Sequence, residues 1–205
     1  MPPGTQALVS QTIDVAYRIH GDRIPLDHAY ALYSAISRLP DTGAWLHQAD
    51  SVGIQPIRGR YAERDTLSLN DNSRLRLRLP AEQLPQILPL VGQTIEIAGQ
   101  RLRIGVPETR PLRAAAAIHA HLVTTRNGQD EDRFDAEVQR QLEALGIDAK
   151  ATRGQRRVLR IRDKTVIGHA LLITGLNAQA SILLQEQGLG GRRKMGCGIF
   201  IRYRG

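Results

Sequence analysis

Six histidines are the side chains of this sequence that could move protons near neutral pH, because imidazole titrates in that range. Three of them surround the first predicted helix: His20, His28 and His47. His119 and His121 lie two positions apart on a strand-like segment and therefore share a face. His169 falls in the apolar segment VIGHALLITG, where a structural role is expected. The front-half histidines are thus the first candidates for general acid–base chemistry.

Metal-dependent chemistry would instead need clustered carboxylates, or His and Cys ligands at characteristic spacings. The acidic residues are scattered or fall on the exposed face of a predicted helix at 130–143, and no HExxH spacing occurs. His119 and His121 could form a weak metal pair, but packing on a strand face is the preferred interpretation. We expect neither a metal nor another cofactor.

The chain ends in a glycine-rich, cationic segment, GLGGRRKMGCGIFIRYRG (188–205). Its glycines permit positive φ and close backbone approach, and Arg192, Arg193 and Lys194 project between them. Nucleotide-binding loops lead from a strand into a helix, whereas this one leads from a predicted helix into a strand. A site for a polyanion is favoured; the alternative is a glycine-capped, solvated connection.

The charge of the chain points to a nucleic-acid partner. The formal net charge is +8, and 25 of the 28 basic residues are arginines, because only three lysines occur: Lys150, Lys164 and Lys194. Arginine's planar fork suits bidentate contact with phosphate, which a merely solvated surface does not require. Aromatic residues make up only 4% of the chain, so recognition by shape and charge is expected rather than base stacking.

The compartment follows from what the sequence lacks. Cys197 is the only cysteine, so no internal disulfide can form. The first residues, MPPGTQALVS, lack the basic-then-apolar order of a signal peptide, and no apolar run approaches the roughly 20 residues that cross a bilayer. A cytoplasmic protein without membrane contact is expected.

Hydrophobic periodicity predicts two similar halves. In the front half a strand, a helix, two strands, a helix and a strand pair follow one another: IDVAYRI (13–19), PLDHAYALYSAISRL (25–39), GIQPIRGRYA (53–62), RLRLRLP (74–80), AEQLPQILPLVGQ (81–93) and TIEIAGQRLRIG (94–105). The second half repeats the order: LRAAAAIHAHLVTT (112–125), DEDRFDAEVQRQLEALG (130–146), the hairpin RRVLRIRDKTVIGHALLITG (156–175), NAQASILLQEQG (177–188) and CGIFIRYR (197–204). Two tandem βαββαβ units are predicted, spanning 1–107 and 108–205, with the boundary near Pro107 to Pro111.

Two stretches carry a family resemblance. GLGGRRKMGCGIF (188–200), after a helix and opening a strand, resembles the C-terminal glycine-rich loop of the RAMP superfamily, the RNA-binding proteins of CRISPR systems. IPLDHAYALYSAISRL (24–39) with AWLHQADSVGIQPIRG (44–59) is similar to the first helix and following loop of the CRISPR endoribonuclease that cuts precursor RNA within its repeats, particularly its short MYXAN-type subgroup.

The resemblance implies an α+β fold of two tandem ferredoxin-like (βαββαβ, RRM-like) domains. It also implies a metal-independent endoribonuclease in which the ribose 2′-OH attacks its own phosphate, leaving a 2′,3′-cyclic phosphate and a 5′-OH. The implied partners are a CRISPR repeat RNA stem-loop and other subunits of a CRISPR effector complex.

The resemblance also assigns catalytic roles. His47, in WLHQ, occupies the place of the family's general acid–base histidine in the loop after the first helix, and Tyr33 matches an assisting tyrosine. His28 and His20 are kept in reserve, and the helix start would lower the proton affinity of His28. Some members carry a lysine shortly after the histidine; this sequence has none before Lys150, and Arg58 or Arg60 are the available substitutes.

The predicted RNA-binding residues are cations and loop glycines. They are Arg192, Arg193, Lys194, Gly190, Gly191, Arg153, Arg156, Arg157, Arg58 and Arg60. Two other functions stay open. One is a non-catalytic RNA-binding subunit of a CRISPR effector complex. The other is a DNA-binding regulator, which is disfavoured because no helix-turn-helix with a basic recognition helix is visible.

Overall fold

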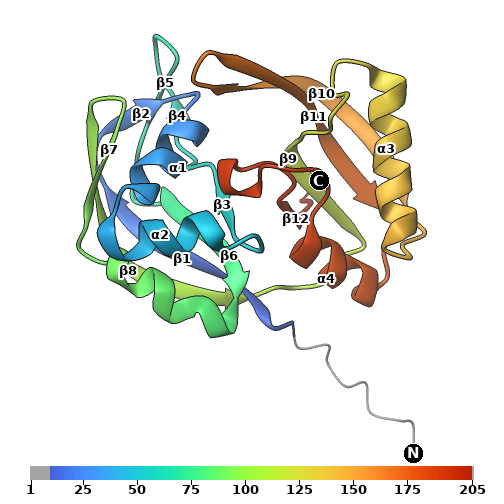
Figure 1. Cartoon of the computed structure of the whole chain (residues 1–205), viewed down its shortest axis with the longest axis horizontal. Coiled ribbons are helices and arrows are strands. Elements are labelled where there is room, and N and C mark those ends of the chain that lie inside the picture. The colour runs from blue at the N-terminus through green and yellow to red at the C-terminus, as the bar shows by residue number, and fades with distance from the viewer. Residues whose placement is uncertain (1–9, 205) are drawn as a thin grey trace, which may run out of the picture.

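The computed structural model describes residues 10–204 (Figure 1). Residues 1–9, which contain most of the segment used to argue against a signal peptide, lie outside the described part, as does Gly205. Within 10–204 no helix is long and apolar enough to span a membrane.

The front half contains the following elements: β1 (Thr12–His20), β2 (Arg23–Pro25), α1 (Ala29–Ser37), α2 (Pro40–Gln48), β3 (Gly53–Gln55), β4 (Arg60–Tyr61), β5 (Thr66–Ser68), β6 (Arg74–Pro80), the 3₁₀ helix η1 (Ala81–Leu90), β7 (Thr94–Ile97) and β8 (Gln100–Pro111). The second half contains β9 (Ala117–Val123), α3 (Glu131–Ala144), β10 (Lys150–Ile161), β11 (Lys164–Thr174), α4 (Ala178–Gln187), the 3₁₀ turn η2 (Arg193–Met195) and β12 (Phe200–Arg202).

Each half is built around one antiparallel sheet. The strand orders are β3-β6-β1-β8-β7 and β10-β11-β9-β12. Numbering the four strands of each βαββαβ unit in chain order, both sheets read 2-3-1-4, with β7 added at the edge of the first. This is the α+β arrangement of two ferredoxin-like domains, and the predicted fold class is confirmed.

The alternating pattern of the sequence decides which face of each sheet forms the core. Leu75, Leu77 and Leu79 of β6 are fully buried in the first core. In the second half α3 contributes Phe134 and Val138 to a separate core. The helices therefore cover one face of each sheet, and the two remaining faces are free to line other surfaces.

A second helix follows α1 where the sequence analysis expected a loop. Leu39 is extended, with φ −71° and ψ 134°, because Pro40 disfavours the helical region for the residue before it. Pro40 itself suits the first helical position, where no N–H is needed, and α2 runs from there to Gln48. His47 consequently lies in the last turn of a helix rather than in a loop.

Prolines also explain two other departures. The predicted helix at 81–93 is a 3₁₀ helix, because Pro85 and Pro89 lack the N–H groups that α-helical hydrogen bonds require. The predicted strand at 53–62 is split after Gln55, next to Pro56, and β4 joins a small separate sheet of order β2-β5-β4.

The two halves meet closely around β3. A Cβ on Gly53 would lie 2.8 Å from Ile199 Cδ1, and one on Gly196 would lie 2.6 Å from Pro56 Cδ. The first sheet extends to Pro111, the far end of the boundary predicted near Pro107 to Pro111, because β8 pairs with β1 that far. The tip of the β10–β11 hairpin reaches back to α1, where Arg162 Nε donates a hydrogen bond to the Tyr30 hydroxyl at 2.8 Å (Figure 1).

Candidate active site

Tyr33 and His47 form a pair on the neighbouring helices α1 and α2. The Tyr33 hydroxyl lies 3.2 Å from His47 Nδ1, and the two rings stand nearly perpendicular at 85°. His47 is exposed, and its Nε2 makes no hydrogen bond to any part of the chain that the structure describes. The tyrosine can therefore orient the imidazole through Nδ1 while Nε2 stays available for a proton from, or to, a substrate.

The glycine-rich loop between α4 and β12 reaches this pair from the other half of the molecule. Lys194 Nζ, in η2, donates a hydrogen bond of 3.0 Å to the backbone carbonyl of His47. A cation at the end of α2 is favoured there, because the last carbonyls of a helix lack intrahelical partners. The C-terminal loop therefore places a lysine beside His47, where the neighbouring sequence has none.

A hollow of about 300 Å³ joins the two parts of the site. It is lined by Tyr33 of α1, Asp50 just after α2, and the loop from Gly190 to Met195. His47 itself does not line the hollow. Its contacts with Tyr33 and Lys194, which both line it, bring the predicted imidazole next to the predicted cationic loop, although they come from different domains.

Comparison with known proteins identifies the family. Residues 13–205 match the sequence model of a protein family described as Cas6 Crispr. The CRISPR-associated endonuclease Cas6 of Myxococcus xanthus is 44% identical over 190 residues, which cover 92% of this chain and 80% of that protein. This chain belongs to the Cas6 family.

Solved structures share the fold at low sequence identity. A CRISPR-associated protein Cas6 superposes with a TM-score of 0.67 at 13% identity, covering 94% of this chain and 100% of that one. A protein described as a RAMP protein binding different RNA substrates gives 0.65 at 15% identity, covering 92% and 98%. The CRISPR endoribonuclease Cse3 bound to 19-nucleotide RNA gives 0.53 at 11% identity, covering 93% and 97%.

Two loop glycines of this Cas6 family member are committed to protein contacts. Gly190 N–H donates to Gln141 Oε1 at 2.7 Å, and Gly191 N–H donates to the Thr124 carbonyl at 3.1 Å. Gly190 has a φ of +71°, and a Cβ there would collide with Thr124 O. The amides of both glycines therefore hold the loop in place. Because both residues also line the hollow, their contact with RNA stays a prediction.

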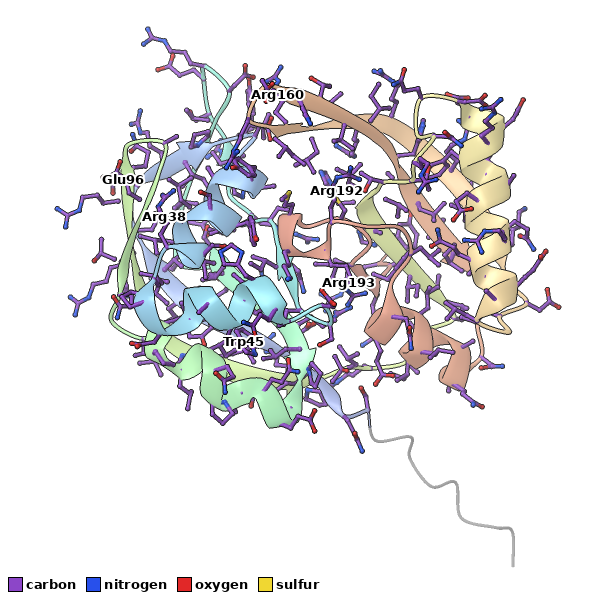
Figure 2. The ribbon with its side chains drawn as sticks, viewed as in Figure 1. Arg38, Trp45, Glu96, Arg160, Arg192 and Arg193 are labelled. Carbon is purple, nitrogen blue, oxygen red and sulfur yellow. The ribbon has the colours of Figure 1, made fainter. Side chains whose placement is uncertain are left out.

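Arg192 and Arg193, both labelled in Figure 2, differ in accessibility. Arg192 is exposed. The three guanidinium nitrogens of Arg193 are buried without a hydrogen-bond partner among the described residues, and the side chain packs over Gly188. Burial, and secondarily the charge of Arg78, lowers the pKa of Arg193 to about 10. A phosphate contact from Arg193 thus requires its side chain to turn outward, which sequence reasoning did not foresee.

His28 is not placed for catalysis, which corrects its reserve role. Only 2% of it is exposed, and its Nδ1 lies 2.9 Å from the Pro25 carbonyl. Its Nε2 accepts a hydrogen bond from the Ile57 N–H at 2.9 Å, which requires the neutral ring. Burial lowers the pKa of His28, consistent with that form. His28 is a structural link between the start of α1 and the segment after β3.

Arg58 and Arg60 do not stand beside His47 as substitutes for a lysine. Arg58 lines a different cleft, described below, and Arg60 lies exposed on β4. Among the predicted hairpin arginines, Arg153 is engaged by two carboxylates of α3, Glu131 at 2.7 Å and Asp135 at 3.0 Å. Arg153 is therefore a structural residue in this conformation, and its predicted RNA contact would cost both ion pairs.

Arg156 and Arg157 are neighbours within β10, the first strand of the β10–β11 hairpin. Arg156 is exposed, whereas the Nε atom of Arg157 is buried without a partner among the described residues. Partial desolvation, followed by the charges of Arg157 and Arg58, lowers the pKa of His121 to about 4. His121 and Arg157 thus lie close together on one face of the second sheet.

A second, larger cleft of about 890 Å³ lies between the two sheets and was missed by sequence reasoning. Its lining is rich in arginine: Arg58, Arg76, Arg78, Arg110, Arg113, Arg202 and Arg204. Burial, then the charges of Arg58 and Arg110, lowers the pKa of Arg76. The alternating arginines of β6 were the available signal, but the residues opposite them come from distant parts of the chain.

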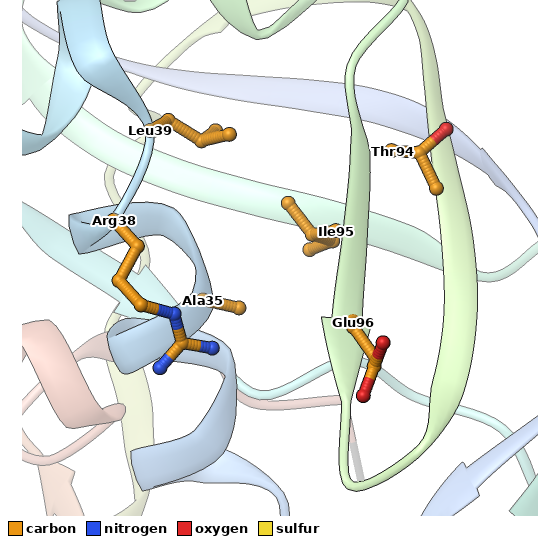
Figure 3. A pocket seen from close by; sticks show the side chains of 6 residues that line it. All are labelled: Ala35, Arg38, Leu39, Thr94, Ile95 and Glu96. Carbon is orange, nitrogen blue, oxygen red and sulfur yellow. The ribbon is translucent and has the colours of Figure 1, made fainter.

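A third hollow, of about 330 Å³, lies between α1 and β7 (Figure 3). Arg38 and Glu96 stand on its two sides, and Ile95 points into it from the strand. None of the residues that line it is among the predicted site residues. Among residues 10–204 no three His, Cys, Asp or Glu side chains gather in a way that could hold a metal ion.

Proposed function

We propose that this Cas6 family member is an endoribonuclease that cleaves precursor CRISPR RNA within its repeats. The observation that carries the proposal is that Tyr33 and Lys194, which line one hollow, both contact His47. The 44% identity to a protein named as a CRISPR-associated endonuclease supports it independently.

In the proposed reaction the substrate supplies its own nucleophile. His47 Nε2 takes up the 2′-OH proton as the bond from O2′ to phosphorus forms, and returns it to the 5′-oxygen as the bond from phosphorus to O5′ breaks. The products are a 2′,3′-cyclic phosphate and a 5′-OH. Tyr33 holds the imidazole through Nδ1, and its hydrogen bond makes it a positioning residue.

The extra negative charge of the phosphorane meets the cations of the loop. Lys194 uses one N–H on the His47 carbonyl and keeps two others, and the exposed Arg192 lies two positions before it. Placed donors that meet charge as it develops are worth about 10²–10³-fold in rate each. No step of this scheme needs a metal ion, so we propose that the reaction is metal-independent.

The partner proposed here is a repeat RNA stem-loop, met in the cytoplasm. The arginine-lined cleft between the sheets offers a path for further RNA away from the scissile bond. Retention of the product by other subunits of a CRISPR effector complex rests on family membership alone.

Cleavage of repeat RNA by the purified chain in EDTA tests the function. We expect cutting in EDTA, one product ending in a 2′,3′-cyclic phosphate, and no cutting when the scissile ribose is 2′-deoxy. Full inhibition by EDTA, or cutting of the 2′-deoxy substrate, would overturn the mechanism. Tight RNA binding with no cleavage would instead identify a non-catalytic RNA-binding subunit.

A further inference from the structure

Arg78 is a charged residue buried between the two domains. Only 1% of it is exposed, and it lies on β6, on the face opposite the buried leucines of that strand. Its neighbour on β1 is Asp14, and Arg78 donates a hydrogen bond to each oxygen of that carboxylate. Nε donates to Oδ1 at 2.7 Å, and Nη2 donates to Oδ2 at 2.8 Å. This fork-to-fork pair fixes the plane and direction of the guanidinium.

The remaining nitrogen of Arg78 crosses to the other domain. Nη1 donates to the Gln185 carbonyl at 3.1 Å and to the Phe200 carbonyl at 2.6 Å. Gln185 lies in the last turn of α4, whose carbonyls lack helical partners, and Phe200 is the first residue of β12. The glycine-rich loop is the segment between these two carbonyls, so one guanidinium holds both of its ends.

The loop contacts the first domain at two further places, one of them close to Arg78. Gly53 of β3 is the direct neighbour of Arg78 across the sheet, and it packs against Ile199 of the loop. At the far side of the loop, Lys194 binds the His47 carbonyl. The loop is therefore attached to the first domain at its two ends by Arg78 and at its middle by Lys194.

Burying an arginine between two surfaces costs desolvation free energy, which its hydrogen bonds offset only when every donor is well placed. A well-packed apolar residue would join the domains at least as strongly. What the guanidinium adds is direction, because its hydrogen bonds define where the two carbonyls sit. This argues for a role in geometry rather than in adhesion.

We propose that Arg78, oriented by Asp14, is a positioning residue that sets the glycine-rich loop at its working distance from Tyr33 and His47. The inference rests on the proposed function for its effect on cleavage. Its structural part, that Arg78 restrains the loop, does not depend on whether the protein cleaves RNA or only binds it. Loss of the hydrogen bonds of Arg78 to the two loop ends is expected to increase the mobility of the loop and to leave both hydrophobic cores folded.

Hydrogen exchange of the full-length protein tests the structural content. Arg78→Met keeps the length of the side chain and removes its donors. We expect amide exchange in residues 188–199 to rise at least tenfold, including Gly198 N–H, which donates to the Leu122 carbonyl at 2.8 Å. Exchange in α3 and the centre of β1 should stay as in wild type. Arg101→Met is the control, because Arg101 is an exposed arginine of the same sheet, on β8, and does not line the cleft.

Single-turnover cleavage of repeat RNA at saturating protein tests the functional content. A loop misplaced by about 1 Å costs on the order of 10²-fold in rate, so Arg78→Met should lower the rate 10- to 100-fold with less than a threefold change in RNA affinity. Asp14→Asn, which leaves Arg78 and its carbonyl contacts in place, should act in the same direction more weakly. If Arg78→Met does not fold, the cleavage rate of Asp14→Asn tests whether the orientation of Arg78 matters.

Three results overturn the proposal: unchanged exchange in the loop, faster exchange spread evenly over the chain, or equal effects of Arg101→Met. If the wild-type protein binds RNA without cutting it, the proposed activity fails while the exchange experiment still decides whether Arg78 restrains the loop.

Discussion

At the scale of single residues, the candidate site depends on one exposed imidazole whose two nitrogens have different surroundings. Nδ1 of His47 is held by Tyr33, and Nε2 faces outward. The buried His28 shows the opposite arrangement, with both nitrogens bound to backbone groups. The same side-chain type is thus available for chemistry at one position and for structure at the other.

Replacing His47 by alanine should lower the single-turnover cleavage rate about 10²–10⁴-fold, because it removes the proposed proton carrier. RNA affinity should change less than threefold, since the loop cations are untouched. His20→Ala is the control, because His20 is also exposed but lies at the end of β1. Equal losses in both variants, measured on the same RNA, would rule out the assigned role.

His28 should make the fold sensitive to acid. Because burial lowers its pKa in the folded state, the unfolded chain binds its proton first as the pH falls. Its stabilising contribution is therefore complete above about pH 6.5, the ordinary histidine pKa, and is lost as the pH falls below that value. Urea unfolding at pH 7 and pH 5 should show this loss.

The matched variants are His28→Gln and His20→Gln. The first should reduce the difference in unfolding free energy between pH 7 and pH 5, at the cost of lower stability at both. The second should leave that difference as in wild type. An undiminished pH difference in His28→Gln would show that other groups account for it.

At the scale of elements, the glycine-rich loop is held by hydrogen bonds of its backbone to neighbouring segments. Gly190 adopts positive φ where a side chain would collide with the Thr124 carbonyl, whereas a Cβ on Gly191 would meet no atom within 4 Å. The two neighbouring glycines therefore have different reasons to be present, although both amides are bound.

Gly190→Ala should destabilise the protein by at least the 1–2 kcal/mol that a left-handed conformation costs, or roughly 2–8 °C in melting temperature. It should also slow cleavage, because the loop must shift away from Thr124. Gly191→Ala is the control and should stay within about 0.5 kcal/mol of wild type. Thermal melting and single-turnover assays of both variants check this, and indistinguishable variants would contradict the role given to Gly190.

At the scale of the whole molecule, positive charge is distributed over two surfaces. The loop meets His47 on one, and the arginine-lined cleft between the sheets forms the other. Arg76 lies among like charges, with Arg58 and Arg110 close enough to lower its pKa. A bound anion would reduce the repulsion among these like charges. We therefore expect part of the bound RNA to cross this cleft.

Replacing Arg58 and Arg76 together by glutamine should therefore weaken repeat-RNA binding. The slope of log affinity against log salt should become smaller by roughly one to two, because each phosphate contact releases about one counterion. The control removes two exposed arginines of α3, Arg133 and Arg140, which are already paired with Asp130 and Glu137. Equal salt slopes for all three proteins in filter binding would exclude the cleft as part of the RNA path.

The sequence by itself determined the local features of this protein. Periods of two and 3.6 residues encode the two βαββαβ units, because each element is selected by its nearest neighbours along the chain. Residue types also identified the acid–base candidates and the cationic loop. Pro40 is a signal for a helix start, in a segment where a loop is predicted.

Only the tertiary structure decided which of these features meet. Lys194 contacts a residue 147 positions away, and Arg78 joins carbonyls on both sides of the loop. Burial of His28 and of the Arg193 guanidinium likewise depends on how separate segments pack. The contacts of Lys194 and Arg78 follow from the docking of two domains, and those of His28 from the packing of separate segments within one domain. No local pattern of residues specifies either.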